Sequence, residues 1–176
     1  MITTLKSSKD VSKIVYVVDA AGFFAGVPLY LDKPSFTVEE VLKEVKDLSS
    51  RQALDLAVSA SKIHIGGYTN EDVHKVIDLA KELGEYGRLS KSDIALLALT
   101  HNLLKGNYRV VVISDDRSVQ NIALKMGADT LGIKRKEIKK PRRYVYVCKS
   151  CGYVATSPGT CPNCGIELTR KNWAGG

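Results

Sequence analysis

Four cysteines in one short stretch constrain the fold of this sequence more than any other feature. They form two Cys-x2-Cys pairs, Cys148 with Cys151 and Cys161 with Cys164, and a glycine follows each pair. In a chain whose thiols stay reduced, this spacing indicates a metal site rather than disulfides. Two such Cys-x2-Cys-Gly segments predict a small ribbon that binds one zinc ion. The ion is expected to be structural, because the four cysteines would occupy all four of its ligand positions. A rubredoxin-like iron centre is the alternative.

The sequence before the cysteines alternates between strand and helix patterns. Residues 14–18 and 108–113 are rich in β-branched residues and indicate strands buried on both faces. Shorter strands are expected at 62–65 and 130–133. This order predicts an α/β fold with a mostly parallel sheet and helices on both faces, followed by the small ribbon.

Helices are expected where apolar residues recur at helical spacing between capping residues and glycines. Thr37 is expected to cap a helix carrying Val38 and Val41, and residues 26–36 before it are expected to form a loop. Ser90 and Asp93 fit a second capping box at the start of a central buried helix. The expected helical ranges are 20–25, 38–45, 51–60, 70–83, 91–104 and 118–126.

Acidic residues follow both strong strands. Asp19 ends the first, Asp115 and Asp116 end the second, and Asp93 and Glu44 are expected near the same edge of the sheet. Carboxylates held close together oppose folding unless a cation joins them, and oxygen ligands without histidine favour Mg²⁺ or Mn²⁺. Such a metal site beside a basic segment suggests phosphodiester hydrolysis by a metal-activated water. Capping of the following helices is the simpler use of the aspartates.

The positive charge is concentrated at the end of the chain. The net charge is +7, and residues 133–176 alone carry ten Lys and Arg against two acids. This distribution favours a nucleic-acid partner, with a solvated lysine-rich tail as the alternative. Two tyrosines beside the first cysteine pair are expected to stack on bases or to pack the ribbon core. The expected RNA-binding residues are Lys134, Arg135, Lys136, Lys139, Lys140, Arg142, Arg143, Tyr144 and Tyr146.

Several classes of protein are excluded by what the sequence lacks. Its apolar runs are far shorter than the roughly 20 residues of a membrane-spanning helix, and the first 13 residues contain no apolar leader segment. We therefore expect a cytoplasmic protein with no membrane partner. Phosphate-binding glycine loops and the serine-hydrolase motif are also missing. No small-molecule substrate is expected.

Four segments resemble a known nuclease family. The segments VVDAAGFF, VEEVLKEVKD, LSKSDIALLALTHNL and ISDDRSVQNIA occur in the order found in PIN-type nuclease domains. Fused to a CxxCG…CxxCG ribbon, they resemble the archaeal Nob-type ribosome-assembly endoribonucleases. The resemblance implies a PIN domain over residues 1–133, a basic linker over 134–143, a zinc ribbon over 144–171 and a tail over 172–176.

The resemblance also assigns roles to the acids. Ser114 matches a small hydroxyl residue that supports the site, and Asp116 matches the family's last acid better than Asp115, which stays a possible additional member. The resemblance implies that Asp19, Asp93 and Asp116 would bind a Mg²⁺ or Mn²⁺ ion. The implied catalytic acids are Asp19, Glu44, Asp93 and Asp116.

The implied activity is that of a metal-dependent endoribonuclease. Its expected substrate is the precursor of small-subunit ribosomal RNA, cut at the 3′ end within a pre-ribosomal particle. Two alternatives remain open: an RNA-binding assembly factor without activity, and a toxin-like PIN nuclease that acts on free RNA.

Overall fold

The computed structural model describes residues 14–44, 52 and 63–173, which contain two sheets. The larger sheet has five strands in the order β3-β2-β1-β4-β5, and every neighbouring pair is parallel. The predicted α/β fold is thus confirmed. In sheet order the strands are Ile63–Ile65, Ser35–Thr37, Ile14–Val18, Arg109–Ile113 and Asp129–Leu131.

The two strongest predicted strands, β1 and β4, lie side by side at the centre of the sheet. Val18 pairs in register with Ile113, and both side chains are fully buried. The backbone N–H of Asp19 continues this pairing by donating to the carbonyl of Ile113 over 3.1 Å. The residues that directly follow the two strands are therefore held close together.

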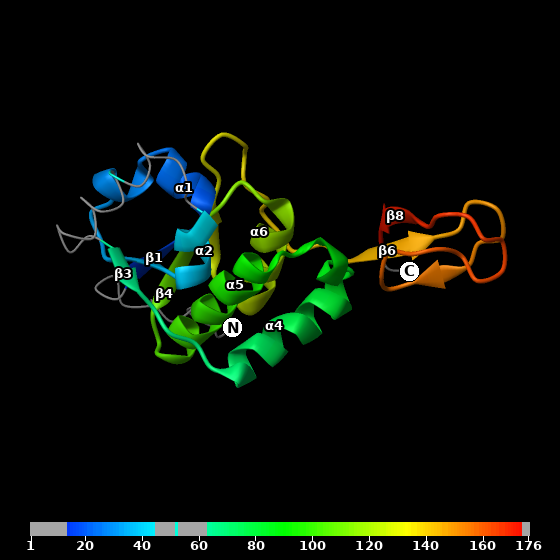
Figure 1. The fold of residues 1–176 in the computed structure, drawn as a ribbon, viewed down its shortest axis with the longest axis horizontal. Coiled ribbons are helices and arrows are strands. Elements are labelled where there is room, and N and C mark those ends of the chain that lie inside the picture. Colours follow the sequence, from blue (N-terminus) through cyan, green and yellow to red (C-terminus); the bar gives the residue numbers. More distant parts are fainter. Residues whose placement is uncertain (1–13, 45–51, 53–62, 174–176) are drawn as a thin grey trace, which may run out of the picture.

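Helices flank the sheet (Figure 1), and α5 contains an unbroken run of buried residues. It packs against α2, α4 and α6, and its residues from Ala95 to Thr100 are all buried. Among the described residues, no helix is long and apolar enough to cross a membrane. The helices are α1 (Ala20–Phe24), α2 (Glu39–Glu44), α4 (Asn70–Leu83), α5 (Lys91–Lys105) and α6 (Arg117–Met126), with short 3-10 turns η2 (Val27–Tyr30) and η3 (Tyr86–Arg88).

One strand was not expected from the sequence. Ser35–Thr37 forms β2 within the segment expected to be a loop followed by a helix cap. Thr37 is fully buried and its hydroxyl donates to the carbonyl of Val18 over 3.0 Å, so the prediction that it caps a helix is wrong. The helix expected over 51–60 lies, apart from Gln52, outside the described residues.

The second sheet forms the ribbon. Its three antiparallel strands have the order β7-β6-β8, with β6 at Tyr144–Val147, β7 at Val154–Ala155 and β8 at Thr169–Asn172. Figure 1 shows the ribbon projecting from one end of the α/β domain, beyond the C-terminal end of α4. The buried side chains of the ribbon form a cluster separate from the main core.

A buried carboxylate ties α4 to α5. Asp72 closes the capping box of α4 with Thr69, and its side chain is fully buried. It also contacts Lys105 Nζ and His101 Nδ1, each over 2.7 Å. Burial alone would raise the pKa of Asp72, but the hydrogen bonds from Lys105, Thr69 and His101 hold it far below its usual range.

We expect Asp72→Asn to lower the free energy of unfolding at pH 7 by about 2 kcal/mol, because charge-assisted bonds are lost. A lowered pKa contributes stability above the unfolded pKa of about 3.9, and this stability is lost as the pH falls through the folded value. The difference between the two proteins should therefore shrink as the pH falls below about 4. Urea unfolding at several pH values measures it. Asp78→Asn, an exposed change on the same helix, should shift stability by less than about 0.5 kcal/mol.

Candidate functional site

A buried serine joins the ends of β1 and β4. Ser114 is fully buried, and its hydroxyl donates to Asp19 Oδ2 over 2.7 Å. The hydroxyl oxygen of Ser114 also accepts the backbone N–H of Asp116 over 3.1 Å. One hydroxyl therefore links Asp19 to the segment that carries Asp116.

Two further serines join Asp93 and Glu44 at the start of α5. Ser90 caps the helix: its N–H donates to Asp93 Oδ2 over 2.7 Å, and its hydroxyl accepts the Asp93 N–H over 3.1 Å. The hydroxyl of Ser92 donates to Glu44 Oε1 and lies 2.8 Å from the hydroxyl of Ser90. The four acids thus come from the ends of β1 and β4, from α2 and from the start of α5. We call Asp19, Glu44, Asp93 and Asp116 the acidic edge.

Within the acidic edge, Asp19 is affected by the charges of Asp93 and Asp116. Burial raises the pKa of Asp19; hydrogen bonds from Ser114 and from the Ala20 N–H oppose the rise, and the charges of Asp93 and Asp116 add to it. Hard oxygen donors in mutual repulsion are a set that fits a divalent cation. Among the described residues, only the four cysteines bring three or more candidate ligand atoms all within 4.8 Å of one another, so the carboxylates are spaced more widely.

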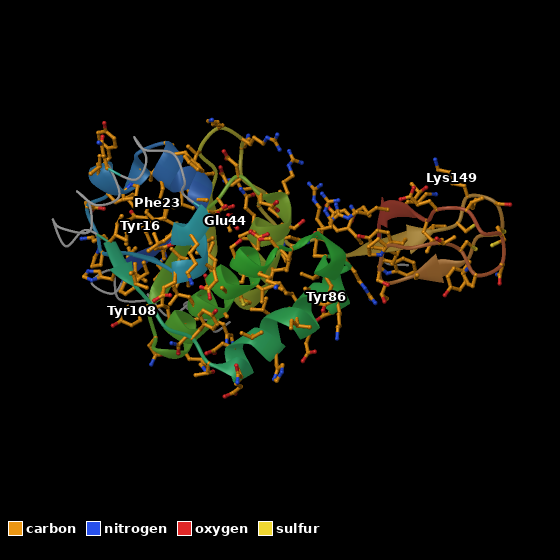
Figure 2. The ribbon with its side chains drawn as sticks, in the orientation of Figure 1. Tyr16, Phe23, Glu44, Tyr86, Tyr108 and Lys149 are labelled. Carbon is orange, nitrogen blue, oxygen red and sulfur yellow. The ribbon has the colours of Figure 1, made fainter. Side chains whose placement is uncertain are left out.

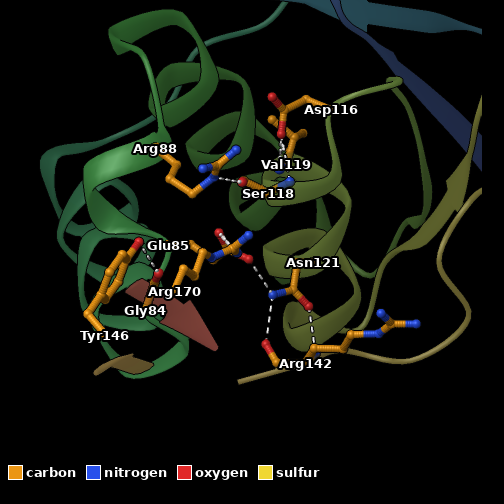
Figure 3. Close-up of polar contacts among 10 residues, drawn as sticks. All are labelled: Gly84, Glu85, Arg88, Asp116, Ser118, Val119, Asn121, Arg142, Tyr146 and Arg170. Atoms are coloured by element: carbon orange, nitrogen blue, oxygen red, sulfur yellow. Dashed lines mark hydrogen bonds and ion pairs between the residues drawn. The ribbon is translucent and has the colours of Figure 1, made fainter. Parts of the chain in front are cut away.

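The aspartates also cap helices, as the simpler interpretation expected. Asp19 accepts the N–H of Ala20, and Asp116 Oδ1 accepts the N–H groups of Ser118 and Val119 over 2.6 and 3.2 Å (Figure 3). A carboxylate has about four acceptor positions. Capping therefore leaves each aspartate able to accept a metal ion as well.

Asp115 does not share this arrangement. Its carboxylate accepts the backbone N–H groups of Ile133, Lys134 and Arg135 over 2.8 to 3.2 Å. Although burial opposes it, these bonds lower the pKa of Asp115. Asp115 is thus occupied with fixing the start of the basic segment, and Asp116 is the member of the pair whose charge reaches Asp19.

The ribbon brings all four cysteines together. The candidate ligand atoms of Cys148, Cys151, Cys161 and Cys164 lie within 4.8 Å of one another. Gly152 and Gly165 have positive φ angles of 76° and 68°, so both turns need the glycine that follows each pair. The arrangement fits a tetrahedral metal ion with four thiolate ligands.

The thiols hold their protons unequally. The backbone N–H of Tyr153 lowers the pKa of Cys151 to about 6, whereas Cys151 raises the pKa of Cys164 to about 11. A bound cation would replace the shared protons, since thiolates are the metal ligands.

The basic segment lies along α6. We call residues 134–143 the basic arm; its seven Lys and Arg residues are exposed. Besides Asp115, Gln120 Oε1 accepts the Ile138 N–H over 2.9 Å, and Asn121 Oδ1 accepts the Arg142 N–H over 2.6 Å. The backbone is therefore fixed on the α/β domain while the charged side chains face solvent.

Two tyrosines were expected to bind RNA, and for Tyr146 this prediction is wrong. Tyr146 is 4% exposed, belongs to the ribbon core and donates its hydroxyl to the carbonyl of Gly84 over 3.2 Å. It therefore packs the ribbon and cannot stack on bases. Tyr144 is partly exposed, and the guanidinium of Arg170 lies 3.5 Å from its ring centroid.

Sequence reasoning missed the polar residues that connect these parts. Ser92 reaches Glu44, while Gln120 and Asn121 fix the basic arm, and all three are buried. Two adjacent amides beside the apolar residues Val119, Ile122 and Ala123 of the same helix were the available signal, because buried amides need hydrogen-bond partners.

Comparisons with known proteins agree on a family. Residues 16–103 match the PIN domain of ribonuclease. Endoribonuclease Nob1 of Pyrococcus abyssi is 35% identical over 159 residues, covering 89% of this chain and 92% of the relative. Endoribonuclease Nob1 of Archaeoglobus fulgidus is 32% identical over 153 residues, covering 87% and 88%. Ribonuclease VapC3 of Aeropyrum pernix is 33% identical over 119 residues, covering 68% and 84%.

Proposed function

This chain belongs to the Nob1 family of PIN-domain endoribonucleases, and on that basis we propose that it matures the 3′ end of small-subunit ribosomal RNA during ribosome assembly. The observation that carries the proposal is the acidic edge, assembled from separate elements in a chain that matches Nob1 relatives over nearly their full length. Its partners would be the precursor RNA and the pre-ribosomal particle, in the cytoplasm.

Asp19, Asp93 and Asp116 would hold the catalytic Mg²⁺ or Mn²⁺. Bound there, the ion would supply an activated water and neutralise charge on the phosphodiester. Ser114 would keep Asp19 oriented, since its hydroxyl bonds one carboxylate oxygen. Glu44, held by Ser92, would complete the acidic set from the side of α2.

The ribbon would hold one zinc ion on its four cysteines. Because no ligand position would stay open, this ion would serve the fold rather than the reaction. An iron centre in its place would colour the protein red. The colour of the protein and its elemental analysis therefore distinguish iron from zinc.

The basic arm would bind the RNA backbone. Lys134, Lys136 and Lys140 are exposed, and we expect their joint replacement by alanine to weaken RNA binding at low salt. For single strands each lost phosphate contact lowers the slope of log K against log salt by about 0.7, so the slope should fall by about 2. Fluorescence anisotropy with a single-stranded RNA at several salt concentrations measures this change.

The matched control replaces Lys33, Lys43 and Lys75, which are exposed elsewhere on the nuclease domain. It removes the same net charge and should change the slope by much less. Equal slopes in the two triple variants would show that only net charge matters and that the basic arm is no RNA site.

Cleavage of a precursor RNA tests the function itself. We would incubate the zinc-loaded protein, freed of other divalent ions, with RNA spanning the 3′ end, adding Mn²⁺ or Mg²⁺, and map the products. Cutting at the mature end only when the metal is present is the expected result. Binding without cutting would favour an assembly factor, and equal cutting of unrelated RNA would favour a toxin-like nuclease.

A further inference from the structure

A buried carboxylate connects three parts of the molecule. Glu85 directly follows the end of α4 and is 1% exposed. It accepts hydrogen bonds from Arg170 of β8 over 2.6 Å and from Asn121 of α6 over 2.8 Å (Figure 3). Asn121 also bonds both the N–H and the carbonyl of Arg142 in the basic arm. Nuclease domain, arm and ribbon therefore meet at Glu85.

The backbone beside Glu85 is packed equally closely. Gly84 ends α4 with a φ of 69°, and a Cβ at this position would collide with the carbonyl oxygen of Tyr144. The hydroxyl of Tyr146 bonds the Gly84 carbonyl, and Arg170 stacks on the ring of Tyr144. The first ribbon strand thus rests directly on the end of α4.

These contacts favour one orientation of the ribbon. A buried carboxylate is tolerated only while its partners stay in place. Turning the ribbon about the end of the basic arm would separate Arg170 from Glu85 and Tyr146 from Gly84. Figure 2 shows Tyr86 near the base of the ribbon and Lys149 toward its far end. Contacts at the base therefore decide where the far end points.

The same contacts set the distance to the acidic edge. Asp116 caps the start of α6, and Asn121 lies five residues further along, about 8 Å at 1.5 Å per residue. The end of the basic arm is held at Asn121 and its start at Asp115. RNA bound along the exposed side chains of the arm would thus lie within reach of the acids.

We propose that Glu85, Asn121 and Arg170 form a lock that fixes the ribbon on the nuclease domain, so that single-stranded RNA held by ribbon and arm enters the acidic edge at one set position. The three are positioning residues, which act through the ribbon and the arm rather than by touching the RNA. The positioning role rests on the proposed function, whereas the rigid attachment of the ribbon does not.

NMR relaxation of the backbone amides tests, without any RNA, whether the ribbon is rigidly attached to the nuclease domain. We expect ribbon and nuclease domain of the zinc-loaded full chain to tumble with one correlation time. In Glu85→Gln the ribbon should reorient faster than the domain, because the charge pair with Arg170 is lost. Glu82→Gln is the matched control: Glu82 pairs with Lys125 over 2.8 Å between α4 and α6, so it loses a charge pair that does not involve the ribbon. It should tumble as the unaltered chain does.

Arg170→Gln provides a second variant that changes only the ribbon side, should Glu85→Gln disturb the nuclease domain. Independent tumbling of the ribbon in the unaltered chain, or unchanged tumbling in both lock variants, would overturn the lock.

Mapping of the cut ends tests the positioning role. The unaltered chain and Glu82→Gln should cut the precursor at one position, and the lock variants should spread the cuts over several nucleotides. A single cut position with a mobile ribbon would overturn the positioning role. Failure of the unaltered chain to cut would count against the proposed function and the positioning role together, while relaxation would still decide the lock.

Discussion

Replacing Cys148 by serine is expected to unfold the ribbon and to leave the nuclease domain folded. Cys148 is 1% exposed in a ribbon core made of a handful of side chains. Such a core is too small to fold unaided, so metal binding would supply its folding free energy, of order 10 kcal/mol. The nuclease domain should survive because its core is a separate cluster.

Elemental analysis and cobalt substitution measure this effect. The unaltered chain should hold about one zinc ion, and Co²⁺ in its place should give the absorption of a tetrahedral thiolate site. Both signals should vanish in Cys148→Ser and persist in Ser157→Ala, an exposed serine of the same ribbon. Amide spectra should show that the ribbon signals collapse while those of the nuclease domain stay. A ribbon that keeps its dispersed signals after loss of the metal would contradict the assignment.

The features that sequence predicted well are those with a local physical signal. β1 and β4 are continuous β-branched runs, which indicate buried parallel strands on their own. Because such strands end at a common edge, the sequence alone indicates that Asp19 and Asp116 lie close together. The cysteine ribbon was equally clear, since its ligands lie close in sequence.

The features that sequence did not predict depend on partners far along the chain. β2 has three residues, of which only Phe36 is apolar, and it exists because β1 and β3 supply its hydrogen bonds. The pairing of Glu85 with Arg170 joins residues 85 positions apart, so no spacing rule could find it. Tyr144 and Tyr146 look equivalent in the sequence. Only the packing of the ribbon on the end of α4 distinguishes them, because it buries Tyr146 against Gly84.

Asp19→Asn is expected to lower the rate of RNA cleavage by at least about 10³-fold, which corresponds to about 4 kcal/mol of transition-state stabilisation. Asparagine keeps the side-chain shape and caps a helix about as well as aspartate, so the bond to Ala20 can persist. What is lost is one anionic ligand at the acidic edge. RNA binding should be unchanged, because the basic arm and the ribbon are untouched. Asp78→Asn, which is exposed on α4, should cut normally.

Stability without added divalent ions should move in the opposite direction. Burial raises the pKa of Asp19, so at neutral pH its ionised form costs folding free energy. That cost is absent below the unfolded pKa and complete above the folded one. Asp19→Asn should therefore melt at the same temperature as the unaltered chain near pH 3, and at a higher temperature at pH 7.

Adding Mn²⁺ should reverse the order of the two melting temperatures. A ligand at one hundred times its dissociation constant stabilises the folded state by about 2.7 kcal/mol, and only the chain with an intact acidic edge gains this. If Asp19 served only as a helix cap, Asp19→Asn would cut RNA at the normal rate and both proteins would respond equally to Mn²⁺. Cleavage, RNA binding and melting with and without the ion, measured on this one substitution, therefore separate a metal ligand from a cap.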